Sequence, residues 1–363
     1  MSSPTPKPGI MDITPYKGGE AKIKGVSQIL KLSSNENAFG ISPKALEAIK
    51  KHSEEAFRYP DGNCNLLRDA LAEKYQIPSE NIVCGAGSDE LIKTICNAFA
   101  GCGDEVLYNY HGFLMYGIYA KAFGATPIKA PEKDFTVDID TLIAAVTPKT
   151  KIVFLANPNN PTGTMVPKNE IERLAKSLPS NILLVIDAAY AEFIEDDNYS
   201  TGFELVSKLP NVAVLRTFSK IYGLGGIRLG FCYCSAAIAD ILNRVRGPFN
   251  VSSLAQEAGI AALGDEDFVD KSKKHNFYWL PKLTEEVNKI GIKTTLSFGN
   301  FILAIFPENG DKTAQNADDF LRKNGIITRR MEPYNLPNTL RISIGRDDEM
   351  NFLIKTLTDF MNG

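Results

Sequence analysis

Between about residues 80 and 235, short apolar segments alternate with segments of helical character, and this alternation constrains the fold more than any other feature. Nearly continuous runs of Val, Ile and Leu are typical of parallel strands buried on both faces of a sheet. The clearest apolar segments are "NIVC" (81–84), "KIVFLA" (151–156), "NILLVI" (181–186) and "VAVLR" (212–216). The sequence therefore predicts an α/β fold with a mostly parallel sheet, whose ligands bind at the carboxyl ends of the strands.

A change of pattern near residue 265 predicts a second domain. A long helical stretch from about Asp265 to Ile290 is followed by strand, helix, two strands and a final helix. At 363 residues the chain also exceeds the usual size of one domain. We expect an N-terminal arm at 1–40, a large α/β domain at 41–264 and a small α+β domain at 265–363.

Composition excludes several classes of function. The formal net charge is −3, which gives no electrostatic reason to expect nucleic acid or an anionic membrane as a partner. No apolar run approaches the roughly 20 residues that span a bilayer. The start, "MSSPTPKPGIMDITPYKGG", lacks the apolar core of a signal peptide and predicts a cytoplasmic protein. The cysteines form no paired CxxC motif and the three histidines are scattered, so we expect no metal site.

Polar motifs follow three of the predicted strands. In "GAGSDE" (85–90), glycines before a helix let backbone amides approach an anion, although such turns also arise for steric reasons. In "NPNNPTG" (157–163), prolines stiffen a turn in which the Asn160 amide can donate a hydrogen bond. Asp187 ends the strand "ILLVI", with Tyr190 three residues on. A carboxylate in that position requires a cationic or protonated partner.

The segment "RTFSKIYGLGGIRLGF" (216–231) contains the chemistry that connects these motifs. Lys220 follows two hydroxyls, Thr217 and Ser219, and Arg228 comes eight positions later. A lone lysine is ordinarily a surface residue. Pyridoxal phosphate, however, requires all of these groups together: an amine for its aldehyde, an acid for its ring nitrogen, donors for its 3'-oxygen, and hydroxyls, an arginine and a helix start for its phosphate.

Taken together, the motifs resemble the fold-type-I pyridoxal-phosphate aminotransferases over nearly the whole chain. Within that family, the subgroup that acts on histidinol phosphate is similar in "PYKGG", "KLSSNENAFGISPKALEAI", "FRYPDGNCNLLRDALAEKY", "HGFLMYGIYA" and "LRISIG". The resemblance implies reversible amino transfer between L-histidinol phosphate and 2-oxoglutarate, with glutamate as the other amino compound, in histidine biosynthesis. It also implies pyridoxal 5'-phosphate as the cofactor and a homodimer.

The resemblance further implies a role for each matching residue. Lys220 would bind the cofactor and, once freed by substrate, carry the proton between the substrate Cα and the cofactor C4'. Asp187 would pair with the ring nitrogen. The other cofactor contacts would be Asn160 and Tyr190 at the 3'-oxygen, Phe113 on the ring face, and Gly87, Ser88, Asp89, Thr217, Ser219 and Arg228 at the phosphate, with Tyr59 reaching the phosphate of the neighbouring subunit.

The side-chain pocket leaves the amino donor open. Arg341 in "LRISIG" matches the arginine that binds an α-carboxylate, and Tyr16 and Arg329 match the contacts to the substrate phosphate. Arg330 stands where relatives often have an acid, which leaves that phosphate contact in question. An aromatic amino acid aminotransferase and a decarboxylase of the threonine-phosphate type are the alternatives. A non-enzymatic regulator is disfavoured because Lys220 and Asp187 are both present.

Overall fold

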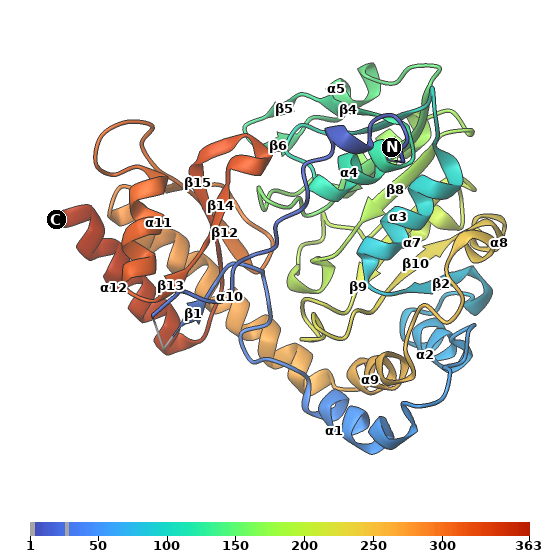
Figure 1. The fold of residues 1–363 in the computed structure, drawn as a ribbon, viewed down its shortest axis with the longest axis horizontal. Coiled ribbons are helices and arrows are strands. Elements are labelled where there is room, and N and C mark those ends of the chain that lie inside the picture. The colour runs from blue at the N-terminus through green and yellow to red at the C-terminus, as the bar shows by residue number, and fades with distance from the viewer. Residues whose placement is uncertain (1–3, 26–28) are drawn as a thin grey trace.

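The large part of the protein is built on a seven-stranded sheet (Figure 1). The computed structural model describes residues 4–25 and 29–363. The strand order is β2-β10-β9-β8-β7-β3-β4. Only β10 runs antiparallel to its neighbours among these strands, which confirms the predicted mostly parallel α/β sheet. The strands are β2 (Ile82–Gly85), β3 (Glu105–Asn109), β4 (Thr126–Ala130), β7 (Thr150–Ala156), β8 (Leu183–Asp187), β9 (Val212–Thr217) and β10 (Gly230–Cys234).

Helices cover both faces of this sheet because its strands are apolar on both faces. In β8, Leu184 and Ile186 pack into one hydrophobic cluster while Leu183 and Val185 pack into another. The first cluster includes residues of α1 (Pro43–His52), α2 (Asn65–Tyr75), α5 (Ile139–Ala144), α6 (Lys168–Ser177), α7 (Phe203–Val206) and α9 (Ser253–Leu263). The second includes residues of α3 (Ser88–Phe99), α4 (Leu114–Ala122) and α8 (Ala236–Val245).

The C-terminal part has its own antiparallel sheet, with the order β11-β12-β15-β14. Its core lies between this sheet and three helices, and α10 connects it to the large part (Figure 1). No helix in the described ranges, α10 included, is both long and apolar enough to cross a bilayer. The elements are α10 (Glu266–Lys289), β11 (Lys293–Thr294), β12 (Phe301–Ile305), α11 (Ala314–Lys323), β13 (Ile326–Ile327), β14 (Arg329–Met331), β15 (Leu336–Ser343) and α12 (Asp347–Asn362).

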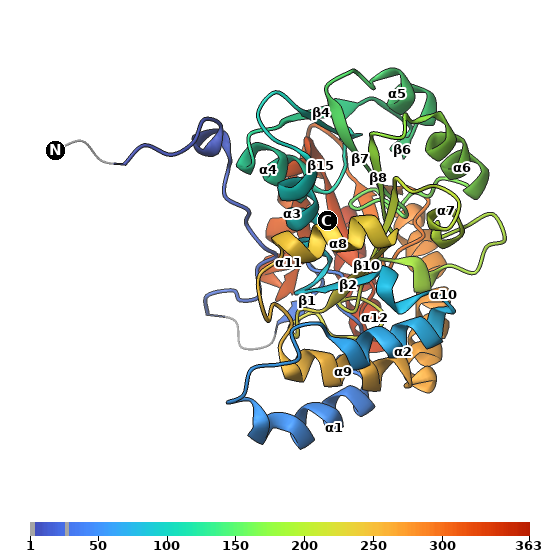
Figure 2. The same ribbon diagram turned by 90° about the vertical axis from the view of Figure 1, so that its right-hand side faces the viewer.

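The N-terminal segment bridges the two parts. Strand β1 (Leu30–Lys31) pairs in parallel with β13, and so joins the C-terminal part. A short helical turn, Ile10–Asp12, lies beside α4 of the large part, and the chain that precedes it projects from the body (Figure 2). Between these two points, Tyr16 and Gly19 line the cavity described below.

Candidate active site

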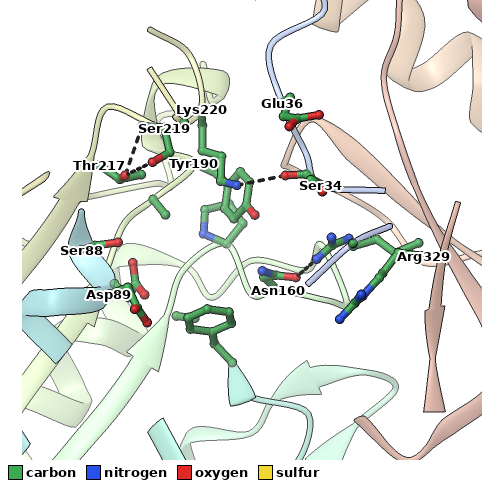
Figure 3. Close-up of a pocket in the computed structure, with 18 of the residues that line it drawn as sticks. Ser34, Glu36, Ser88, Asp89, Asn160, Tyr190, Thr217, Ser219, Lys220 and Arg329 are labelled. Carbon is green, nitrogen blue, oxygen red and sulfur yellow. Dashed lines mark hydrogen bonds between the residues drawn. The ribbon is translucent and has the colours of Figure 1, made fainter. Parts of the chain in front are cut away.

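A cavity of about 290 Å³ lies where the carboxyl ends of β7, β8 and β9 face the small sheet. It gathers residues that are widely separated in sequence (Figure 3). Of the residues predicted from the sequence, Gly87 and Tyr59 do not line it. Those that do are Tyr16, Ser88, Asp89, Phe113, Asn160, Asp187, Tyr190, Thr217, Ser219, Lys220, Arg228, Arg329 and Arg341.

One end of the cavity is a cradle suited to an anion. Gly87 has φ +86°, and a Cβ on it would lie 2.4 Å from Nη2 of Arg228, so a larger residue does not fit there. Arg228 Nη1 lies 3.4 Å from the Ser219 hydroxyl, which in turn accepts from the Thr217 hydroxyl at 3.0 Å. Helix α3 begins at Ser88, so its free amides face the same region. A cation, hydroxyls and a helix start together favour a phosphate.

Lys220 lies in the loop that follows β9 and lines the cavity. Its Nζ donates a hydrogen bond to the Ser34 carbonyl at 3.3 Å (Figure 3). Burial, reinforced by the nearby Arg341 charge, lowers the pKa of Lys220 to about 8. More of the amine is therefore unprotonated near neutral pH than in an ordinary lysine, as a nucleophilic lysine requires.

Asp187 ends β8 with one carboxylate oxygen paired and the other not. The Tyr116 hydroxyl donates to Oδ2 at 2.8 Å, whereas Oδ1 is buried with no hydrogen-bond partner among the described residues. Burial raises the pKa of Asp187 to about 6. An unpaired buried acceptor of this kind suits a protonated ring nitrogen.

Tyr116 was not predicted from the sequence. Its ring packs edge-on against Phe113 at 5.8 Å and stacks on Phe154 at 4.3 Å. The available signal was its spacing: three residues after Phe113 on a helix, a side chain lies on the same face. Nothing local showed that this face meets Asp187, 71 residues away.

Asn160 and Arg341 interact across the cavity from the two parts of the protein. Arg341 Nη1 donates to Asn160 Oδ1 at 2.6 Å, and its Nη2 donates to the Ser33 carbonyl at 2.9 Å. Because the Asn160 oxygen is engaged, its amide NH₂ remains available as a donor. The Tyr190 hydroxyl accepts from Asn35 at 2.9 Å and can still donate. Two donors are thus placed for an anionic ring oxygen.

The mouth of the cavity is formed by the N-terminal segment and the small sheet. Arg329 donates to the Gly18 carbonyl at 2.6 Å and lies 5.9 Å from the centre of the Tyr16 ring. In the pairing of β14 with β15, Arg329 lies opposite Arg341 and Arg330 lies opposite Leu340. Because neighbouring residues of a strand point to opposite faces, the side chains of Arg329 and Arg330 lie on opposite faces of the sheet. Arg330 pairs with Glu332 and does not line the cavity.

Some residues that line the cavity were not predicted from the sequence. They include Ser33, Ser34, Glu36 and Tyr334.

Tyr59 lies outside the cavity of its own chain. It is 85% exposed, and its ring stacks on Phe249 at 4.9 Å. The structure of one chain therefore brings the other predicted cofactor residues together and leaves Tyr59 on the surface.

These observations fit the predicted cofactor. The cradle at Gly87 and Arg228 matches a phosphate, and the orphaned Oδ1 of Asp187 matches a ring N–H. Lys220 supplies an amine of lowered pKa and Phe113 an aromatic ring, both lining the same cavity. The donor set is therefore the one that pyridoxal phosphate requires.

Comparison with known proteins agrees with a pyridoxal-phosphate site. The family model for aminotransferase class I and II matches residues 27–357. The chain is 54% identical to the histidinol-phosphate aminotransferase of Paramagnetospirillum magneticum over 99% of both chains, and 54% identical to that of Rhodospirillum rubrum over 99% of this chain and 98% of the relative. The crystal structure of histidinol-phosphate aminotransferase from Sinorhizobium meliloti in complex with pyridoxal-5'-phosphate superposes with a TM-score of 0.91, at 28% identity and 99% coverage of both chains. The chain therefore belongs to the class I and II aminotransferases and, within them, to the histidinol-phosphate aminotransferases.

Proposed function

We propose that this protein is a pyridoxal-phosphate-dependent aminotransferase that exchanges the amino group between L-histidinol phosphate and 2-oxoglutarate. The observation that carries the proposal is the single cavity holding Lys220, Asp187 and two arginines of the small sheet, Arg329 and Arg341. Full-length relatives at 54% identity that are named for this reaction support the choice of substrate.

Each residue contributes a distinct physical role. Bound pyridoxal phosphate supplies an electron-accepting ring that stabilises negative charge at the substrate Cα. Lys220, with its lowered pKa, would accept the proton from the substrate Cα and return it at the cofactor C4'. Asp187 would place a negative charge beside the ring nitrogen, and Arg228 and Ser219 would hold the phosphate. Phe113 would pack on the ring face.

Two different substrates must use one cavity. Arg341 presents a guanidinium suited to the carboxylate of glutamate. Arg329 stands at the mouth, where its hydrogen bonds go to the carbonyls of Lys17 and Gly18. These are neutral acceptors, which the phosphate of histidinol phosphate can replace with stronger charge-assisted bonds.

The donor assignment predicts a selective effect of Arg329→Gln. Loss of a charged hydrogen bond to phosphate should raise the KM for histidinol phosphate about 10- to 100-fold. The KM for glutamate should change several-fold less, because its α-carboxylate binds Arg341. Steady-state kinetics with each donor measures both values. Arg330→Gln is the matched control, since its side chain leaves the opposite face of the strand and should leave both KM values unchanged. Equal losses for both donors would contradict the assignment.

A substrate panel tests the activity itself. Histidinol phosphate, phenylalanine, tyrosine and aspartate are offered as donors with 2-oxoglutarate, and carbon dioxide release is recorded in parallel. We expect histidinol phosphate to give the highest kcat/KM without carbon dioxide. A preference for phenylalanine or tyrosine would indicate an aromatic aminotransferase, and carbon dioxide release a decarboxylase. A cytoplasmic location is part of the same proposal, and cell fractionation tests it.

We further propose that the enzyme is a homodimer in which Tyr59 reaches the partner's cofactor site. Tyr59 and the Phe249 ring on which it stacks are both exposed, an apolar pair that a second copy would cover. Its own cavity lies elsewhere, so its hydroxyl is free for another chain.

Mixing two defective variants tests the shared site. Tyr59→Ala should weaken cofactor binding about tenfold through loss of a charged hydrogen bond, and Lys220→Ala should be inactive. A hybrid dimer contains one intact site, in which Lys220 of one chain meets Tyr59 of the other. Random re-pairing makes about half of the dimers hybrids, so a 1:1 mixture should recover about a quarter of wild-type activity at limiting cofactor. No recovery in a mixture shown by sedimentation to contain hybrids would refute the shared site.

A further inference from the structure

Glu132, outside the cavity, is a buried carboxylate with an unusually complete set of donors. It lies in the two-residue strand β5 (Glu132–Lys133), and its side chain is 4% exposed. Oε1 accepts from the Asn109 amide at 2.5 Å and from the His111 backbone N–H at 2.9 Å. Oε2 lies 2.6 Å from Nδ1 of His111. Burial opposes ionisation, but these hydrogen bonds outweigh it and hold the pKa of Glu132 below its ordinary value.

All three donors belong to the segment that leads into the active site. Asn109 ends β3, and His111 is two residues before Phe113, which caps α4 and lines the cavity. Gly112 between them is tightly enclosed, since a Cβ there would lie 2.8 Å from the Tyr108 ring. His111 is therefore separated from Phe113 by one closely packed residue.

The same segment also supports the turn that holds Asn160. The carbonyl of His111 accepts a hydrogen bond from the Asn159 amide at 3.3 Å, and that amide also donates to the Thr162 hydroxyl at 2.9 Å. Asn159 immediately precedes Asn160, the donor placed for the ring oxygen. The Glu132 carboxylate is thus connected, through His111, to Phe113, which is proposed for the face of the cofactor ring, and to Asn160, which is proposed for the ring oxygen.

The hairpin that carries Glu132 is itself held from the other end. Between β5 and β6 (Thr136–Val137), Asp134 and Phe135 have φ of 48° and 61°, as a two-residue hairpin turn requires at both of its positions. The Phe135 carbonyl accepts from the Thr164 hydroxyl at 2.8 Å. Its ring packs against a small-sheet cluster that includes Tyr334, a cavity residue.

We propose that Glu132 and His111 are positioning residues, which hold Phe113 and Asn160 in place for the cofactor without touching it. Neither side chain lines the cavity. A buried carboxylate need not be hydrogen-bonded to a segment that leads into the cavity, and Asp265 is an example. Asp265 is also buried and accepts from the Ser42 hydroxyl at 2.6 Å and from the Lys44 amide at 3.3 Å, yet it joins α1 to α10 away from the cavity.

Glu132→Gln tests this role with pyridoxal phosphate alone, so the outcome does not depend on which amino donor is correct. The variant keeps the shape of the side chain but loses its charge and one acceptor. When cofactor-free enzyme is titrated, we expect the dissociation constant to rise about tenfold. The visible circular dichroism per bound cofactor should also change, because it reports the orientation of the ring.

Asp265→Asn is the matched control, because it makes the same isosteric change at a buried carboxylate. Both variants should lower the melting temperature, but only Glu132→Gln should change the dissociation constant and the dichroism. If Glu132→Gln changes only the melting temperature, its role is structural and the proposal fails.

Substitutions of the partner keep the proposal testable if Glu132→Gln does not fold. His111→Asn retains an N–H donor near the position of Nδ1 and should preserve both readouts. His111→Leu removes the donor and should reproduce the tenfold loss of affinity. Where the double variant Glu132→Gln/His111→Leu folds, its loss of cofactor affinity should be no larger than that of the weaker-binding single variant, because the two residues act as one unit. Equal behaviour of His111→Asn and His111→Leu would overturn the proposal.

Discussion

Replacing Lys220 with alanine should abolish amino transfer, with kcat falling by about four orders of magnitude or more. The loss removes both the amine that binds the cofactor aldehyde and the base that moves the Cα proton. The visible absorbance band of the bound cofactor should shift accordingly, because the covalent attachment to the protein is lost. A coupled assay and an absorbance spectrum of the purified variant measure the two effects.

Lys129→Ala is the matched control for this substitution. Partial desolvation lowers the pKa of Lys129, but this lysine is more exposed than Lys220, lies over the Tyr110 ring and does not line the cavity. It should retain wild-type activity and spectrum. Residual transfer by Lys220→Ala within about tenfold of wild type would contradict the assigned role, since proton transfer alone accounts for more than that.

Asp187→Asn should reduce kcat about 10³-fold while leaving the protein folded. The amide can still accept from the Tyr116 hydroxyl, but it carries no charge to stabilise a protonated ring nitrogen. Steady-state kinetics at saturating cofactor separates this effect from weaker binding. Activity within a few-fold of wild type would show that no charge is needed at this position.

The same substitution should stabilise the cofactor-free protein, and increasingly so at higher pH. Folding raises the pKa of Asp187 from 3.8 to about 6, so the folded state binds the proton more tightly and loses stability as pH rises through that range. Asparagine has no such dependence. The advantage of the variant in free energy of unfolding should therefore grow by about 1 to 1.5 kcal/mol between pH 5 and pH 7.5. Urea unfolding at the two pH values measures it, and a constant difference would contradict the raised pKa.

Much of the site could be predicted because parallel strands bring their carboxyl ends to one edge of the sheet. Asp187 and Thr217 are the last residues of neighbouring strands, and Asn160 follows the end of a third. A continuous apolar run therefore predicts both the strand and the location of the polar residue that follows it. The chemistry of Lys220 could be inferred for the same reason, because Asn160, Asp187 and Thr217 precede it in the chain at the ends of such strands.

The residues that were missed act through contacts that no local pattern encodes. Tyr116 was an ordinary helical tyrosine until the fold placed its hydroxyl on Asp187, and Glu36 was one acid in a polar stretch until it lined the cavity. His111 has its partner, Glu132, 21 residues later in a strand of only two residues. Two-residue strands have too little periodicity to be recognised from sequence.

By itself, the sequence determined the type of sheet and predicted the edge at which ligands bind and the candidate reacting groups, because these follow from apolar periodicity and from residue types at strand ends. Only the tertiary structure decided which oxygen of Asp187 is unpaired, that Arg329 faces the cavity while Arg330 does not, and that Glu132 accepts a hydrogen bond from the His111 backbone. Those features depend on long-range packing and burial, which set hydrogen-bond partners and pKa values only after distant segments have come together.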